Sequence, residues 1–201
     1  VAMQTTVFTR RGVERVLRYG FELARKRPRH ELASVTKSNA MQYAMVFWDE
    51  VYRELQADYP DVACRQYHVD AMAARFITAP ESLDVVVASN LFGDILTDLG
   101  GALQGSLGIP PSGNINPEGR YPSMFEPVHG SAPDIAGQGI ANPLAMFLSA
   151  ALMLRHGLGW ESEATALESA VDRALAGGLR TPDLGGSATT AEATEAVLSN
   201  L

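Results

Sequence analysis

Apolar residues recur every three or four positions in several stretches of the chain. The stretch from Thr9 to Arg27 carries arginines on one side and ends before Pro28, and its apolar positions are Val13, Val16, Leu17, Phe21 and Ala24. This spacing predicts an amphipathic helix that stops at the proline, because proline cannot continue a helix. The same periodicity predicts another amphipathic helix over residues 161–176.

Two more helices are predicted in the second half of the chain. The run from Pro143 to Leu154 is interrupted only by Ser149, which predicts a buried helix. It is too short to cross a bilayer, which takes roughly 18 residues or more. The last helix is expected to start at Thr189 and to run to the end of the chain, because Thr189 and Glu192 have the spacing of a capping box.

Short apolar runs alternate with helical patterns in the first half. The predicted strands are Leu32–Thr36, Cys64–Val69 and Leu83–Ala88. The predicted helices that follow them are Met41–Tyr59, Ala71–Thr78 and residues 91–99. Alternation of this kind indicates parallel strands joined by helical crossovers, so the predicted fold class is α/β, with the strand before residue 90 covered on both faces.

Polar side chains follow each of the three predicted strands. Lys37 and Asn39 follow the first, Asp70 follows the second, and Asn90 with Asp94 follows the third. In open α/β sheets ligands bind outside the carboxyl ends of the strands. The sequence therefore predicts a site at this edge of the sheet, although an exposed, salt-bridging lysine is the more usual reading of Lys37 alone.

Two carboxylates are expected to share one face of the helix at residues 91–99. Asn90 can cap this helix, and Asp94 and Asp98 lie one turn apart. Like charges at that spacing repel by a few tenths of a kcal/mol. A hard cation such as Mg²⁺ or Mn²⁺ would explain the pair, because it favours carboxylate oxygens. The alternative is a solvated acidic face, which is the commoner case.

A Gly- and Pro-rich stretch separates the two halves. Residues from Gly105 to Tyr121 predict a loop or a domain crossing with little regular structure. The following cluster, Phe125 to Pro143, places glycines, His129, an aspartate and an asparagine before a helix whose first position suits Pro143. Helix amino termini favour anions, so a nucleotide could bind here. An ordinary loop with a structural histidine is the alternative.

Composition narrows the function classes. The 201 residues are 46% hydrophobic, which is enough for one large domain or two small ones. The net charge of −7 argues against nucleic-acid and anionic-membrane partners. Cys64 is the only cysteine, and no signal peptide is visible, so a cytoplasmic protein without disulfides is expected. Walker A, CxxC, HExxH and GxSxG motifs are absent.

Taken together, four segments resemble the β-decarboxylating dehydrogenases, the family of isopropylmalate, isocitrate and tartrate/D-malate dehydrogenases. These segments are Thr36–Asn39, Val69–Met72, Asn90–Leu99, and Glu126–Asp134 continuing through Gly139–Pro143. The resemblance spans nearly the whole chain. Val35–Tyr43, Phe47–Glu50 and Tyr121–Phe125 are most similar to the tartrate/D-malate branch.

The resemblance implies an isopropylmalate dehydrogenase-like open sheet with helices on both faces. Residues 1–104 would be part of a central dimerisation and metal-site domain, and residues 105–201 part of a cofactor-binding domain. The family's reaction is the oxidative decarboxylation of a 2-hydroxy dicarboxylic acid, here of the tartrate or D-malate type.

The resemblance also assigns roles to individual residues. Asp94 and Asp98 of one subunit would bind Mg²⁺ or Mn²⁺ together with Asp70 of the other subunit of a homodimer, and Lys37 would accept a proton. Asn39 would contact substrate or nicotinamide. The cofactor residues are expected to be Glu126, His129, Gly130, Ser131, Ala132, Asp134, Ile135 and Asn142. Asp134 favours NAD over NADP, because a carboxylate accepts hydrogen bonds from a ribose 2′-hydroxyl and repels a 2′-phosphate.

One departure from the family is large. The chain begins roughly where the second half of the family's members begins, so the catalytic tyrosine and the substrate-binding arginines have no counterpart. We therefore expect the carboxyl-terminal portion of such an enzyme. Two alternatives stay open: an inactive fragment that acts only as a non-catalytic α/β dimerisation module, and isopropylmalate as the substrate.

Overall fold

The computed structural model describes residues 1–201, which form two compact units, Val1–Gly100 and Gly101–Leu201. Each unit has its own cluster of buried apolar side chains, and each is described by itself below. None of the helices is both long enough and apolar enough to cross a membrane.

The first unit is built on a three-stranded parallel sheet. Strand β1 (Glu31–Thr36) lies in the centre, with β2 (Ala63–His68) on one side and β3 (Val85–Val87) on the other. All three strands run the same way, so their carboxyl ends lie at one edge of the sheet. The predicted α/β class and the predicted parallel pairing are confirmed.

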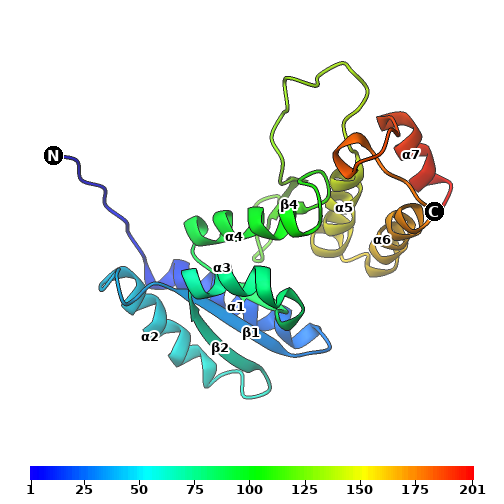
Figure 1. Ribbon diagram of the computed structural model, residues 1–201. Coiled ribbons are helices and arrows are strands. Elements are labelled where there is room, and N and C mark those ends of the chain that lie inside the picture. Colours follow the sequence, from blue (N-terminus) through cyan, green and yellow to red (C-terminus); the bar gives the residue numbers. More distant parts are fainter. The chain divides into compact units, whose positions relative to one another are not determined.

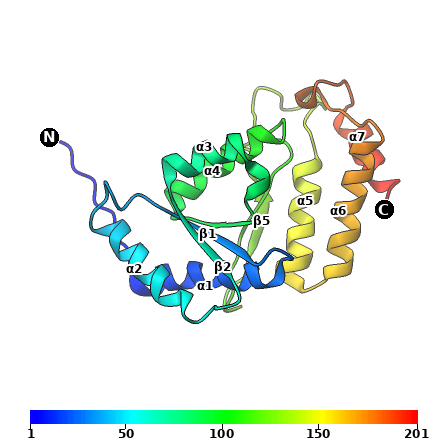
Figure 2. The same cartoon turned by 60° about the horizontal axis from the view of Figure 1, so that its bottom comes forward.

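Helices cover both faces of this sheet (Figures 1 and 2). Helices α1 (Arg10–Lys26) and α2 (Ala44–Gln56) lie on one face, and α3 (Val69–Thr78) and α4 (Asn90–Leu103) on the other. A 3₁₀ turn, η1 (Pro80–Ser82), leads from α3 towards β3. Parallel strands need a long crossover connection, usually a helix, which accounts for the helices between successive strands.

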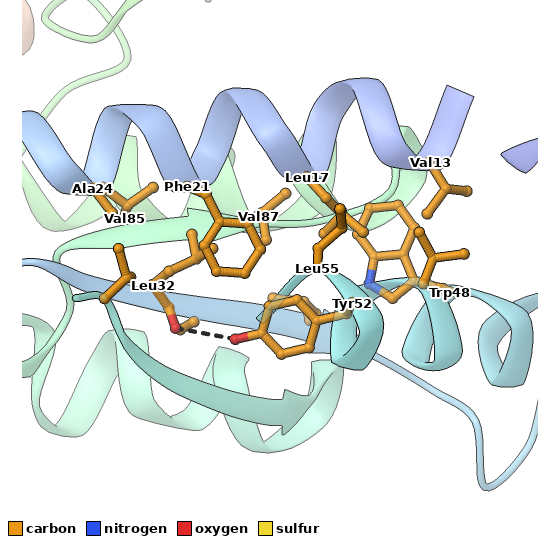
Figure 3. Packing of buried hydrophobic residues seen from close by; sticks show 14 of the residues in the cluster. Val13, Leu17, Phe21, Ala24, Leu32, Trp48, Tyr52, Leu55, Val85 and Val87 are labelled. Carbon is orange, nitrogen blue, oxygen red and sulfur yellow. Dashed lines mark hydrogen bonds between the residues drawn. The ribbon is translucent and has the colours of Figure 1, made fainter. Parts of the chain in front are cut away.

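Most of the buried core of the first unit lies between the sheet and helices α1 and α2 (Figure 3), and Met72 of α3 with Phe92 and Leu96 of α4 completes it from the other face. Phe21 stacks on both Tyr52 and Tyr59, and all three rings are buried. The polar atoms of the larger rings have partners: Trp48 donates from its indole nitrogen to Ser34 Oγ at 2.9 Å, and the Tyr52 hydroxyl donates to the Arg65 carbonyl at 3.0 Å. These bonds remove most of the cost of burying a polar group.

The second unit combines a short hairpin with packed helices. Strands β4 (Pro111–Asn114) and β5 (Met124–Pro127) pair antiparallel, and both contact α5 (Leu144–Leu152). A π-helical turn, η2 (Met153–Leu158), leads to α6 (Glu161–Ala176). The 3₁₀ turn η3 (Pro182–Leu184) and α7 (Thr190–Leu198) follow. Leu144, Val171 and Val197 bring α5, α6 and α7 into one buried cluster.

Several boundaries differ from the prediction. Helix α2 begins at Ala44 and ends at Gln56, because residues before it form a turn in which the amide of Met41 donates to the carbonyl of Lys37. Asp70 lies in the first turn of α3, which begins two residues earlier than expected. Asn90 is the first residue of α4 rather than its cap.

The second unit also contains structure that the sequence pattern did not predict. The stretch expected to be a loop, Gly105 to Tyr121, contains β4, and β5 lies in the polar cluster that follows. Pro143 is the N-cap of α5 rather than its first helical residue. Helix α5 is less buried than predicted, since Met146 is 56% exposed, and Val16 of α1 is exposed at 40%.

The predicted capping box at the start of α7 is confirmed. Thr189 Oγ1 accepts from the Glu192 amide at 3.2 Å, and the Glu192 carboxylate accepts from the Thr189 amide at 2.8 Å. Replacing Thr189 with alanine leaves helix donors without partners, so we expect the second unit to lose about 1 kcal/mol of its free energy of unfolding. Denaturant unfolding measures this loss. Thr165→Ala, at an exposed interior position of α6, is the control and is expected to change stability by less than about 0.5 kcal/mol.

Candidate functional site

Lys37 and Asp70 meet at the carboxyl edge of the sheet. Lys37 is the first residue after β1, and Asp70 is the second residue of α3, which follows β2 directly. The Lys37 ammonium forms an ion pair with Asp70 Oδ1, with the lysine side chain 26% exposed and the aspartate side chain 67% exposed. Hydrogen bonding from this ammonium lowers the pKa of Asp70 below its ordinary value. Two residues that are distant in the sequence therefore meet at the edge where the strand ends were expected to gather polar groups.

The turn after β1 explains why Lys37 takes this position. The carbonyl of Lys37 accepts from the amides of Ala40 and Met41, at 3.0 and 2.8 Å, which reverses the chain as soon as the strand ends. Thr36 Oγ1 accepts from the amide of Ser38 at 3.3 Å. Asn39 lies within this turn and is exposed. Its side chain is therefore open to a ligand.

Asp94 and Asp98 lie one helical turn apart on α4, which follows β3. Both are exposed, whereas Phe92 and Leu96 of the same helix are buried in the core of the first unit. The prediction that the two carboxylates share one face of this helix is confirmed, but Ile95 of the same helix is 50% exposed and does not pack into the core. Thr97 donates from Oγ1 to the Asp94 carbonyl at 3.0 Å and takes no part in the carboxylate pair.

The donor set at this edge suits a hard divalent cation. Asp70, Asp94 and Asp98 are exposed carboxylates, the ligand type that Mg²⁺ and Mn²⁺ favour. No group of three or more His, Cys, Asp or Glu side chains in this chain is arranged to hold a metal ion. The prediction divides the ligands between two subunits, so the assignment of these three residues stays a prediction for a single chain.

The candidate cofactor residues lie along one exposed segment of the second unit. Glu126 projects from β5, and the residues from His129 to Asp134 are exposed, with Ile135 and Asn142 half-buried. His129 Nδ1 lies 2.9 Å from the Gly130 carbonyl, and because a carbonyl only accepts, Nδ1 is the donor in this hydrogen bond. The assignment of these residues to a cofactor stays a prediction.

The shape of this segment leaves room for a ligand. A Cβ added to Gly130 would meet no heavy atom within 4 Å. Gly137 and Gly139 have positive φ angles of 77° and 67°, which residues with side chains rarely adopt. Ala132 also has a positive φ, 41°, and its carbonyl accepts from the Ile135 amide at 3.1 Å. An exposed backbone with several glycines allows a nucleotide's phosphates and ribose to approach it closely.

Three residues that sequence reasoning missed support this segment. Thr190, the first residue of α7, donates its amide to the Gly139 carbonyl at 2.8 Å and its hydroxyl to the Ala141 carbonyl at 2.6 Å. Asp183 Oδ2 accepts from Asn142 Nδ2 at 2.9 Å and also from the Ser106 hydroxyl. No sequence pattern links these distant positions, so only the fold reveals them.

The carboxylate of Asp183 is held in its charged form. Partial burial raises its pKa, but hydrogen bonds to the carboxylate, among them those from Ser106 and Asn142, outweigh burial, and the pKa lies below its ordinary value. Asp183 therefore acts as a charged acceptor at neutral pH.

Comparison with known proteins identifies the family that the sequence resembles. The sequence profile of the family described as isocitrate/isopropylmalate dehydrogenase matches residues 1–197. A probable tartrate dehydrogenase/decarboxylase of Bacillus subtilis (strain 168) is 54% identical over 201 residues, which is 100% of this chain and 56% of the relative. The D-malate dehydrogenase [decarboxylating] of Escherichia coli (strain K12) is 50% identical over 201 residues, 98% of this chain and 56% of the relative.

Solved structures have the same fold. The isocitrate dehydrogenase of Methylococcus capsulatus matches with a TM-score of 0.91 at 40% identity, over 98% of this chain and 57% of that one. A β-decarboxylating dehydrogenase of Thermococcus kodakarensis in its apo form matches with a TM-score of 0.85 at 37% identity, over 96% and 56%. The chain therefore spans about half the length of the curated relatives it matches.

Proposed function

This chain belongs to the isocitrate/isopropylmalate dehydrogenase family, and we propose that it serves the NAD- and divalent-metal-dependent oxidative decarboxylation of a 2-hydroxy dicarboxylic acid of the tartrate or D-malate type. The observation that carries this proposal is the meeting of Lys37 and Asp70 at the carboxyl edge of a parallel sheet, beside which α4 begins. Ligands of open α/β sheets bind at this edge. Isopropylmalate is the alternative substrate.

The first unit supplies the metal ligands. Asp94 and Asp98 of one subunit and Asp70 of a second copy of the chain are proposed to hold Mg²⁺ or Mn²⁺. The ion supplies positive charge that polarises the oxygens of the substrate's hydroxyl and carboxylate groups. In a homodimer of this kind each site is completed by the partner, which explains why one chain alone contains no complete metal cluster.

Lys37, as the neutral amine, is proposed to accept the proton of the substrate hydroxyl. Oxidation removes this proton and a hydride from the same H–C–OH carbon, and the resulting β-keto acid then loses the carboxylate that is β to the new ketone as carbon dioxide, leaving an enolate that takes up a proton. An amine at the strand end, with its side chain only 26% exposed, is placed to hold a proton away from bulk water. Asn39, in the next turn, would orient substrate or nicotinamide.

The second unit is proposed to bind the adenosine half of NAD, which accepts the hydride. The backbone from His129 to Asn142 would receive the phosphates and ribose, with Glu126, Gly130, Ser131, Ala132 and Ile135 beside it. Asp134 would accept hydrogen bonds from the ribose 2′-hydroxyl, which favours NAD over NADP. On this proposal Val1–Gly100 carries the metal and dimer functions and Gly101–Leu201 the cofactor function.

Exposed apolar side chains support dimerisation through the first unit. Ile77 of α3 is 62% exposed, and Leu91 and Ile95 of α4 are 62% and 50% exposed. Apolar residues on adjacent helices favour contact with another protein surface over contact with water. The same feature also suits the second candidate function, a non-catalytic α/β dimerisation module. A measurement of metal binding is therefore needed to distinguish the two functions.

Titration of the purified chain with Mn²⁺ by calorimetry tests the metal site. We expect saturable binding that is lost in the Asp94→Asn/Asp98→Asn double variant, because this variant removes both carboxylates that one subunit contributes from α4. Asp172→Asn/Glu195→Gln removes the same charge from exposed positions of α6 and α7 and should leave binding intact. Circular dichroism verifies that all three proteins are folded.

Each outcome decides between the candidates. A folded wild-type chain that binds no Mn²⁺ contradicts the catalytic proposal and favours the dimerisation module. If binding occurs, NAD reduction measured with tartrate, D-malate and isopropylmalate identifies the substrate. Equal loss of binding in the control variant would show that overall charge, rather than the α4 pair, attracts the ion.

A further inference from the structure

We propose that Asp183 is a positioning residue that fixes the side-chain amide of Asn142 and so sets the geometry with which the His129–Asn142 segment receives the cofactor. This inference rests on the proposed function, in which that segment binds the adenosine half of NAD. It assigns a role to a residue in η3, far from the segment in the sequence but in direct contact with it in the second unit.

The amide of Asn142 is held at both ends. Its Oδ1 accepts from the backbone amide of Leu144, the first residue of α5, at 2.9 Å. Its Nδ2 donates to Asp183 Oδ2, also at 2.9 Å. Because a backbone amide only donates and a carboxylate only accepts, these partners determine which end of the amide carries oxygen and which carries nitrogen.

Ser106 fixes the carboxylate in turn. Its hydroxyl donates to Asp183 Oδ2, and its oxygen accepts from the Gly108 amide at 2.8 Å. The carboxylate oxygen that meets Asn142 is therefore held by a second donor, from the loop before β4. A charged acceptor with two donors forms stronger hydrogen bonds than a neutral one.

Close packing restricts the same amide sterically. A Cβ at Gly108 would lie 2.9 Å from Asn142 Cβ, 2.9 Å from Asp183 Oδ2 and 3.1 Å from Asn142 Nδ2. The backbone of Gly108 thus approaches the Asn142 and Asp183 side chains more closely than any other residue type would allow. This close approach restricts the orientations that the Asn142 side chain can take.

A fixed amide favours ligand binding because its remaining hydrogen-bond donor and acceptor are held in fixed directions. Asn142 donates one Nδ2 hydrogen to Asp183 and uses one Oδ1 lone pair to accept from the Leu144 amide. It therefore retains one hydrogen that it can donate and one lone pair that can accept. Asn142 is half-buried and stands at the end of the exposed cofactor segment. Without Asp183 the amide could rotate, and a ligand would have to order it on binding, which reduces affinity.

A double-mutant cycle on the full 201-residue chain tests the positioning role, with NAD as the calorimetric probe. Asp183→Ala and Asn142→Ala should each weaken NAD binding about tenfold, and the double variant should also lose only about tenfold, because Asp183 acts through Asn142. Asp183→Asn keeps an acceptor oxygen for Nδ2 and should restore affinity to within about threefold of the wild type. Asp172→Ala is the matched control on exposed α6 and should bind NAD normally.

Nuclear magnetic resonance provides a readout that needs no cofactor. In the apo chain the Asn142 side-chain amide signals should move in Asp183→Ala and return close to their wild-type positions in Asp183→Asn. Signals that do not move, or a double variant about a hundredfold weaker than the wild type, overturn the positioning role. A wild-type chain that binds no NAD instead overturns the proposed cofactor site and this inference with it. NAD binding with additive losses overturns the role of Asp183 alone.

Discussion

Replacing Phe21 with alanine is expected to lower the free energy of unfolding of the first unit by about 3–5 kcal/mol, the range found when buried aromatic side chains are truncated. Phe21 is 0% exposed. Its ring stacks on Tyr59 with centroids 4.5 Å apart and on Tyr52 at 5.7 Å, so truncation removes two aromatic contacts as well as buried area. The cavity that truncation of Phe21 would leave lies between helices α1 and α2 and the sheet (Figure 3).

The buried indole of Trp48 makes this loss measurable. Trp48 is 2% exposed and lies in the same cluster, so its fluorescence during denaturant unfolding reports the first unit, with Trp160→Phe removing the second tryptophan. Tyr43→Ala is the control, because Tyr43 is 92% exposed and its truncation should change stability by less than about 0.5 kcal/mol. A Phe21→Ala variant as stable as Tyr43→Ala would contradict the packing described above.

Replacing Gly186 with alanine is expected to destabilise the second unit by about 3 kcal/mol, the upper end of the cost of overpacking. A Cβ at this position would lie 2.1 Å from the carbonyl oxygen of Arg180. That oxygen cannot turn aside, because it accepts from the Ala188 amide at 3.0 Å while the Gly186 amide donates to Thr181 at the same distance. The added methyl group must therefore open the turn that follows η3.

Hydrogen exchange at the amides of α6 and α7 measures this effect within the second unit. Gly130→Ala is the control, because a Cβ there meets nothing within 4 Å, and its stability should stay within about 0.5 kcal/mol of the wild type. Asp183 lies in η3, directly before this turn. Gly186→Ala should therefore also disturb the Asn142 amide signals. Unchanged exchange in Gly186→Ala would mean that the chain between Arg180 and Ala188 takes another path.

Regular periodicity made most helices predictable from the sequence. Helix α6 occupies the predicted residues 161–176, and α1 differs by one residue at each end, because their apolar positions repeat over several turns. Strand β4 was missed for the opposite reason. Its sequence, Pro111 to Asn114, lacks the β-branched and aromatic residues typical of strands, and it is held extended by pairing with β5 and by contact with α5.

The candidate site was predictable only where topology constrains it. Parallel strands bring their carboxyl ends to one edge, so the order of strands and helices in the sequence is enough to place Lys37 and Asp70 together. The contact of Asn142 with Asp183 follows from no such rule. It depends on how a turn after α6 packs against the start of α5, and single-sequence patterns do not encode that packing.

The sheet of the first unit also determines the order in which the chain can fold. Its central strand, β1, precedes both of its partners in the sequence, and each partner follows only after a whole helix or more. A ribosome therefore releases β1 before either strand that satisfies its backbone has been synthesised. Until β2 and β3 emerge, α1 and α2 are the elements of this unit that can shelter the apolar residues of β1. We expect that interval to be when the nascent chain is most prone to aggregate.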